Sequence, residues 1–179
     1  AEVTALSIEK ITDLDRLAEI AAALRAEGHR LVLCHGTFDL IHIGHIRHLQ
    51  AARREGDALF VTLTADAYVT KGPDRPVFNE TLRLENTAAL ACVDHVALVH
   101  DITALPAINA VQPTIYVKGG DYRDEGDDLT GNIRREMDAV AAHGGQTVFT
   151  DDIVFSSTRL LNEHFTVFSR EVRDYLAEF

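Results

Sequence analysis

The stretch HGTFDLIHIGHIRHL, residues 35–49, follows an apolar run and carries four of the chain's nine histidines. His42 and His45 are three residues apart at the predicted start of a helix, so both side chains lie on the same face. A helix start presents backbone N–H groups and the positive end of the helix dipole, and both favour phosphate. Imidazoles placed there can donate hydrogen bonds to phosphate oxygens and stabilise the charge that develops in phosphoryl or nucleotidyl transfer. This stretch therefore predicts a phosphate site at a strand-to-helix turn.

Two neighbours of the paired histidines refine this prediction. Gly44 lacks a side chain, so a ligand can approach the backbone closely. His48 extends the spacing by a further three residues, which raises the alternative of a zinc site. Because no cysteine or carboxylate completes a tetrahedral set, we expect no metal bound by protein side chains. His35, at the end of the apolar run, is left open between a core residue and a nucleotide contact.

The rest of the chain alternates between two patterns. Apolar runs predict strands at residues 30–36, 57–66, 95–100, 114–120 and 146–150. Amphipathic runs with capping residues predict helices at residues 12–28, 43–56, 79–93, 102–111, 131–145, 156–165 and 169–179. This alternation indicates an α/β fold, a single Rossmann-like doubly wound parallel sheet of about five strands with helices on both faces. Ligands of such sheets bind beyond the carboxyl ends of the strands, where the strand order reverses.

Composition sets the class of protein. The chain has 179 residues, of which 46% are hydrophobic, and this suits one domain over residues 1–165 with a helical tail at 166–179. A net charge of −11 argues against a nucleic-acid or membrane partner. No apolar run is long enough to cross a bilayer and no basic leader opens the sequence, so we expect a cytoplasmic protein. Cys34 and Cys92 stand far apart in apolar sequence, which favours reduced thiols.

Four stretches together resemble a known family. The run GTFDLIHIGH, residues 36–45, resembles the signature of the HxGH nucleotidyltransferase superfamily, which includes the cytidylyltransferases. KGPDRPV (residues 71–77) resembles its lysine loop, and VKGGDY (117–122) and FSSTRL (155–160) resemble its later site elements. The greatest likeness is to the adenylyltransferase domain of bifunctional heptose enzymes, which pair a sugar kinase with an HxGH domain. The resemblance implies transfer of a nucleotidyl group from a nucleoside triphosphate to a phosphorylated sugar or alcohol, with release of pyrophosphate.

The resemblance also implies roles for individual residues. His42, His45 and Lys71 would contact the triphosphate and stabilise the transition state. Asp39 would fix the histidine turn or assist a metal, and Mg²⁺ would accompany the nucleotide. The nucleotide site would comprise Gly36, Thr37, Phe38, Asp39, Gly44, Lys118, Gly119, Gly120, Asp121, Ser156, Ser157 and Thr158. The acceptor site would comprise Arg83, Arg75 and Asp66.

Several alternatives stay open at this point. ATP with a heptose 1-phosphate-like acceptor is favoured, and CTP with a polyol or sugar phosphate is the alternative. The run TDDIVFSSTRL lacks the arginine that precedes the serines in choline- and glycerol-phosphate enzymes, and heptose adenylyltransferases usually carry asparagine at the position of His35. A nucleotide-binding regulatory module without catalysis is the alternative from another class. A homodimer through residues 82–93, a fused kinase domain in a longer chain, and a place in capsule or lipopolysaccharide precursor synthesis rest on the resemblance alone.

Overall fold

The computed structural model describes residues 7–70, 72, 75–119 and 131–150. The helices expected at 156–165 and 169–179, and with them the predicted domain boundary at residue 165, lie outside the described residues. The described chain forms a single sheet with helices on both faces, as the alternating sequence pattern predicts.

The sheet contains six strands, all parallel, in the order β1-β4-β3-β2-β5-β6. Their bounds are β1 Ile11–Thr12, β2 Leu31–Gly36, β3 Ala58–Thr64, β4 His95–Val99, β5 Ile115–Lys118 and β6 Gln146–Phe149. The expected count of about five strands is thus corrected to six. The additional strand is β1, whose two residues pair with β4 at the edge of the sheet. A two-residue strand leaves no period in the sequence, and here it directly precedes a helix.

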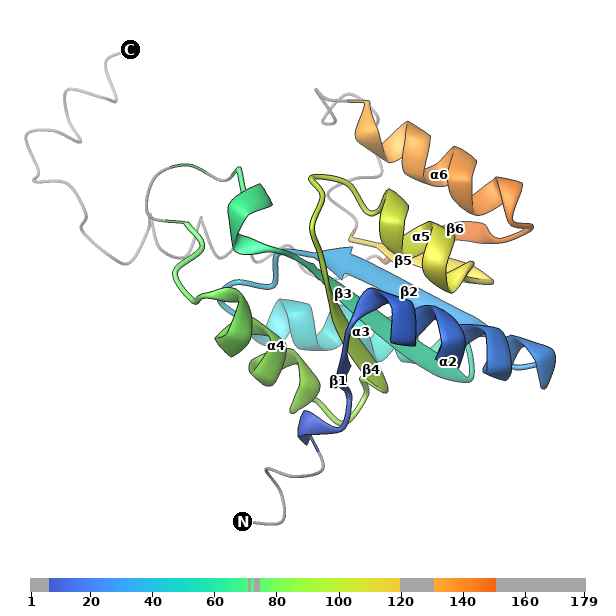
Figure 1. The fold of residues 1–179 in the computed structure, drawn as a ribbon, viewed down its shortest axis with the longest axis horizontal. Coiled ribbons are helices and arrows are strands. Elements are labelled where there is room, and N and C mark those ends of the chain that lie inside the picture. Colours follow the sequence, from blue (N-terminus) through green and yellow to red (C-terminus); the bar gives the residue numbers. More distant parts are fainter. Residues whose placement is uncertain (1–6, 71, 73–74, 120–130, 151–179) are drawn as a thin grey trace, which may run out of the picture.

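Among the described residues, five α-helices and one 3₁₀ helix connect the strands. Their bounds are α2 Leu14–Ala26, α3 Ile43–Arg54, η1 Asp66–Tyr68, α4 Glu80–Ala88, α5 Leu105–Val111 and α6 Asn132–Ala142. Asp13 caps α2 by accepting a hydrogen bond from the Arg16 backbone N–H, and Asn79 caps α4 in the same way from Leu82. Helices α2, α5 and α6 cover one face of the sheet, and α3 and α4 cover the other (Figure 1).

Each face of the sheet packs against its own hydrophobic core. Leu31 and Leu33 of β2 lie in the core under α2 and α5, whereas Val32 and Cys34 lie in the core against α3 and α4. Successive strand residues point to opposite faces, so a strand covered on both sides is apolar throughout. All seven residues of β3 are buried for this reason. The continuous apolar runs of the sequence are therefore central strands.

The order of the strands locates the place where a ligand can bind. From β2 the chain moves outward to β3 and then β4, and it afterwards crosses over to β5 on the other side of β2. The strand order therefore reverses between β2 and β5, and the crevice outside their carboxyl ends is the expected ligand site. The histidine stretch follows β2, and Gly119 follows β5.

No helix among the described residues combines the length and the hydropathy that crossing a membrane requires.

Candidate functional site

The turn after β2 has an unusual backbone that the glycine before it makes possible. Phe38 has φ 47°, in the left-handed region that residues with a side chain rarely adopt. Its ring is buried and meets the His45 ring edge-on, with the ring centroids 5.5 Å apart. A Cβ atom at Gly36 would lie 3.2 Å from the Phe38 ring, closer than ordinary van der Waals contact. Glycine at position 36 thus leaves room for the ring that supports His45.

His42 and His45 cap the first turn of α3 with their own rings. The Gly44 backbone N–H donates to His42 Nδ1 (3.1 Å), and the His42 backbone N–H donates to His45 Nδ1 (3.4 Å). An Nδ1 atom that accepts a hydrogen bond carries no proton, so each neutral ring carries its proton on Nε2. The ring centroids are 4.1 Å apart, and burial lowers the pKa of His42. The turn therefore presents two neighbouring imidazoles whose donor atom is Nε2.

Asp39 connects the histidine turn, residues 36–45, to the end of the lysine loop and the residue that follows it. Its carboxylate accepts hydrogen bonds from the backbone N–H groups of Val77 and Phe78, both at 2.9 Å, and it is almost fully buried. Arg75 lies alongside, with Nε 3.0 Å from Asp39 Oδ2. Both oxygens are thus engaged by the protein itself. Of the two roles expected for Asp39, this geometry supports fixing the backbone rather than holding a metal.

Arg83 occupies the interior instead of a position facing an acceptor. Its side chain is fully buried, and Nη1 donates to the Thr37 carbonyl at 2.6 Å. Nη2 donates to the Thr64 carbonyl (2.8 Å) and to Asp66 Oδ1 (2.6 Å), and Nε donates to the Phe78 carbonyl (3.1 Å). All four of these hydrogen bonds end on the protein, so the described guanidinium holds protein segments, and the contact with an acceptor phosphate stays a prediction.

Asp66 and Arg75 are likewise engaged within the protein. Asp66 Oδ2 accepts from the Glu80 backbone N–H (3.0 Å), while the Asp66 backbone N–H donates to Glu80 Oε2 (2.8 Å). This reciprocal pair joins the end of β3 to the start of α4. Arg75 faces Asp39 as described, and its side chain is only 12% exposed. Of the three expected acceptor-site residues, Arg83 and Asp66 therefore bind each other, whereas Arg75 binds Asp39.

Lys118, at the end of β5, points into the face covered by α5 and α6. Its ammonium lies 3.4 Å from Glu136 Oε2, and that carboxylate also accepts from the Tyr116 hydroxyl (2.9 Å) and the Ala104 backbone N–H (2.8 Å). Gly119 follows directly, and a Cβ atom there would meet none of the described residues within 4 Å. Lys118 is thus a buried partner of Glu136, while Gly119 follows the end of β5 beside the switch point.

Two further histidines bond to threonine hydroxyls of other segments. His35 bonds through Nδ1 to the Thr62 hydroxyl (2.9 Å) and through Nε2 to the Thr64 hydroxyl (3.2 Å). Burial, with the nearby Lys118 charge, lowers the pKa of His35 to about 4, so the ring is neutral. His48 bonds to the Thr150 hydroxyl at 2.9 Å. Within the described parts of the chain, no three His, Cys, Asp or Glu side chains gather as a metal site would require.

Six of the predicted site residues lie outside the part of the chain that the structure describes. Those outside the described residues are Lys71, Gly120, Asp121, Ser156, Ser157 and Thr158. They stay predictions of the sequence.

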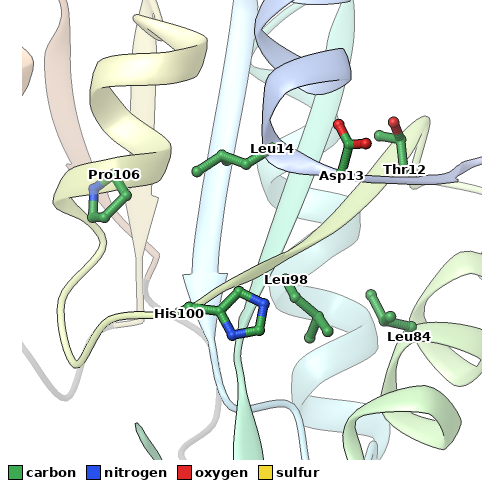
Figure 2. Close-up of a pocket in the computed structure, with 7 residues that line it drawn as sticks. All are labelled: Thr12, Asp13, Leu14, Leu84, Leu98, His100 and Pro106. Atoms are coloured by element: carbon green, nitrogen blue, oxygen red, sulfur yellow. The ribbon is translucent and has the colours of Figure 1, made fainter.

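A separate cavity of about 370 Å³ lies at the carboxyl ends of β1 and β4. Figure 2 shows its lining, which consists of Thr12, Asp13, Leu14, Leu84, Leu98, His100 and Pro106. It shares no residue with the histidine turn, and most of its side chains are apolar. Hydrocarbon groups cannot replace the hydration of a triphosphate. The candidate phosphate site is therefore the histidine turn and not this cavity.

Paired histidines at the switch point of a doubly wound parallel sheet define a site of the nucleotidyltransferase class. The chain belongs to the cytidylyltransferase-like family, whose family profile matches residues 33–163.

Relatives and a solved structure agree with this assignment. The chain is 44% identical over 152 residues to "Bifunctional protein HldE" of Trichlorobacter lovleyi, covering 80% of this chain and 30% of that protein. It is 48% identical over 118 residues to the protein of the same name from Geotalea uraniireducens, covering 65% of this chain and 24% of that protein. The chain thus spans less than a third of the length of these relatives. The crystal structure of a lipopolysaccharide core biosynthesis protein from Thermoplasma volcanium matches 71% of this chain and all of that one, with a TM-score of 0.59 and 25% identity.

Proposed function

We propose that this chain transfers an adenylyl group from ATP to a heptose 1-phosphate or a closely similar sugar phosphate, yielding an ADP-sugar and pyrophosphate. The observation that carries this proposal is the pair of neighbouring imidazoles on the first turn of α3, at the switch point between β2 and β5. The choice of ATP and heptose rests on the likeness to the HldE proteins, and the likeness to a solved lipopolysaccharide core biosynthesis protein agrees with it.

The chemistry is a single displacement at phosphorus. An oxygen of the acceptor's phosphate attacks the α-phosphorus, and the new O–P bond forms as the bond to the bridging oxygen breaks. The electron pair of that bond leaves with pyrophosphate. Nε2–H groups of His42 and His45 donate to the oxygens on which negative charge accumulates, and the N-terminus of α3 adds its dipole. Such a reaction depends on positioning and charge stabilisation and needs no covalent intermediate.

Magnesium belongs to the substrate in this proposal, as the ion bound to the triphosphate. The carboxylates of Asp39 and Asp66 do not fit a resident ion. Asp39 accepts from two backbone N–H groups and pairs with Arg75, and Asp66 accepts from Arg83 and from a backbone N–H. Both carboxylates thus orient protein segments.

Pyrophosphate release tests the proposal. The chain is incubated with Mg²⁺ and each of ATP, CTP, GTP and UTP against a panel of heptose, hexose and polyol phosphates. The proposal expects release with ATP and a heptose 1-phosphate. Release only with CTP would keep the reaction and overturn the base and acceptor proposed here. Nucleotide binding without release against any acceptor would favour the regulatory module and overturn catalysis.

Two features of the whole protein are part of the proposal. The relatives are named bifunctional and are more than three times as long as the matched stretch, so we expect a second, kinase domain to accompany this one in the natural protein. The homodimer expected around residues 82–93 stays a prediction, and the partly exposed Leu82 of α4 is its candidate contact.

A further inference from the structure

We propose that Arg83 is a positioning residue, which holds the histidine turn and both ends of the lysine loop in register through one buried guanidinium. This inference rests on the proposed nucleotidyl transfer. It assigns Arg83 a role that acts through other residues and requires no contact with either substrate.

The first argument is the set of segments that meet at this side chain. Arg83 lies on α4, and its partners are the Thr37 carbonyl in the histidine turn, the Thr64 carbonyl at the end of β3 and the Phe78 carbonyl after the lysine loop. Three stretches that are far apart in sequence thus depend on a single group. Arginine presents five N–H donors in a rigid plane, so it can fix several acceptors at once.

The second argument is the path from Arg83 to the histidines. The Thr37 carbonyl that Arg83 binds belongs to the peptide group that leads into Phe38, whose φ is 47°. The Phe38 ring packs against His45, whose ring centroid is 4.1 Å from that of His42. A hydrogen bond of 2.6 Å to this carbonyl therefore fixes a peptide plane on which the position of both imidazoles depends.

The third argument is the anchoring of the lysine loop. On the N-terminal side of the lysine loop, Asp66 of η1 accepts hydrogen bonds from Arg83 Nη2 and from the Glu80 backbone N–H at the start of α4. At its far end, the Phe78 carbonyl binds Arg83 Nε, while the Val77 and Phe78 N–H groups bind Asp39 of the histidine turn. The segment between these ends includes Lys71, a proposed phosphate contact. Arg83 thus joins the two groups of residues that are proposed to surround the triphosphate.

The test compares Arg83→Ala and Arg83→Lys with the wild type and with Leu17→Ala. Leu17 is fully buried in the core on the opposite face of the sheet, so its variant reports the effect of lost stability alone. The measurements are kcat and the KM for ATP, with and without added guanidinium ion, and the NMR shifts of the His42 and His45 ring nitrogens. These shifts report the positions of the imidazoles whether or not an acceptor is present.

We expect Arg83→Ala to lower kcat on the order of 10²-fold with little change in KM, since a displacement of about 1 Å costs that much. Guanidinium ion should restore part of kcat and the wild-type histidine shifts in Arg83→Ala but not alter Leu17→Ala. Arg83→Lys keeps the charge without the planar fork, so it should fold and still lose kcat. If Arg83→Ala does not fold, the kcat and the histidine shifts of Arg83→Lys test the inference.

Wild-type kcat and wild-type histidine shifts in the folded Arg83 variants would overturn the inference. So would losses that equal those of Leu17→Ala and do not respond to guanidinium. A wild-type chain that releases no pyrophosphate would refute the proposed function instead, and the histidine shifts would still decide whether Arg83 positions the turn.

Discussion

Two buried charged groups, Arg83 and Glu136, occupy opposite faces of the same sheet near its carboxyl edge. Arg83 donates to three backbone carbonyls and one carboxylate, and all of these lie in segments around the histidine turn. Glu136 accepts from the Ala104 backbone N–H, the Tyr116 hydroxyl and the Lys118 ammonium. Arg83 thus fixes segments that connect strands and helices, whereas Glu136 of α6 ties that helix to the start of α5 and to β5.

This difference separates positioning from stability. Removing Arg83 removes the hydrogen bonds that fix the backbone around the proposed phosphate contacts, so we expect the main loss in kcat. Removing Glu136 leaves the Lys118 ammonium buried without its carboxylate, so the expected loss is in folding free energy. Three predictions examine this distinction, in order of decreasing effect on stability.

The largest effect is expected for Glu136→Ala. Breaking a buried ion pair by removing one partner costs about 3–5 kcal/mol of unfolding free energy. Asp138→Ala on the same helix is the matched comparison, since its pair with Arg134 is of similar length (3.5 Å against 3.4 Å) but the two side chains are 72% and 68% exposed, so water screens the charges and the loss should be clearly smaller. Urea denaturation monitored by circular dichroism measures both. Equal losses in the two variants would contradict the distinction.

The next effect concerns pH and His35, which lies beside Lys118. The folded-state pKa is about 4, against an ordinary value of 6.5, so between these values the unfolded chain binds a proton that the native chain does not. Stability from this source is complete above pH 6.5 and is lost as the pH falls toward 4, by up to about 1.4 kcal/mol per pH unit.

His35→Asn removes this titration and matches the residue usual in heptose adenylyltransferases. Between pH 7 and pH 4 the wild type should lose about 3 kcal/mol more unfolding free energy than the variant. Urea denaturation at a series of pH values gives the difference in slope. If the unfolding free energies of wild type and variant change equally with pH, folding does not lower the pKa of His35. That result would contradict a native ring that stays neutral in its bonds to Thr62 and Thr64.

The smallest effect is expected for Arg75→Met. This change removes the cation beside Asp39 but leaves the two backbone N–H groups that bind the same carboxylate. We expect a loss of about 1–2 kcal/mol, because the pair is buried. The control is Arg16→Met, which breaks a surface pair with Glu19 that is about two-thirds exposed and should cost at most about 0.5 kcal/mol. Thermal unfolding resolves the two, and an equal shift would refute a structural role for Arg75.

Much of the fold could be predicted from the sequence because its elements carry strong local patterns. Continuous apolar runs mark the buried strands, and capping residues mark the starts of α2 and α4. β1 was missed since two residues cannot show a period, and its existence depends on pairing with β4, more than eighty residues away.

The candidate site could be predicted only in part. The placement of His42 and His45 at a helix start follows from the GTFDLIHIGH run, and the structure confirms it. The position of Arg83 could not be foreseen, because its acceptors are carbonyls of residues 37, 64 and 78, and every residue has a carbonyl. The sequence predicts Lys118 near the nucleotide, but its partner Glu136 lies 18 residues further along the chain, where no spacing rule connects them.

The most direct test of the central claim is single-turnover transfer from α-labelled ATP to heptose 1-phosphate by the wild type, His42→Ala, His45→Ala and the double variant. His143→Ala is the control, because that ring bonds to Asn109, away from the switch point. If the two Nε2–H groups stabilise the transition state, each single variant should lose about 10²–10³-fold in rate. The double variant should lose less than the product, since the rings act as a unit. Transfer at the wild-type rate in either single variant would contradict the account.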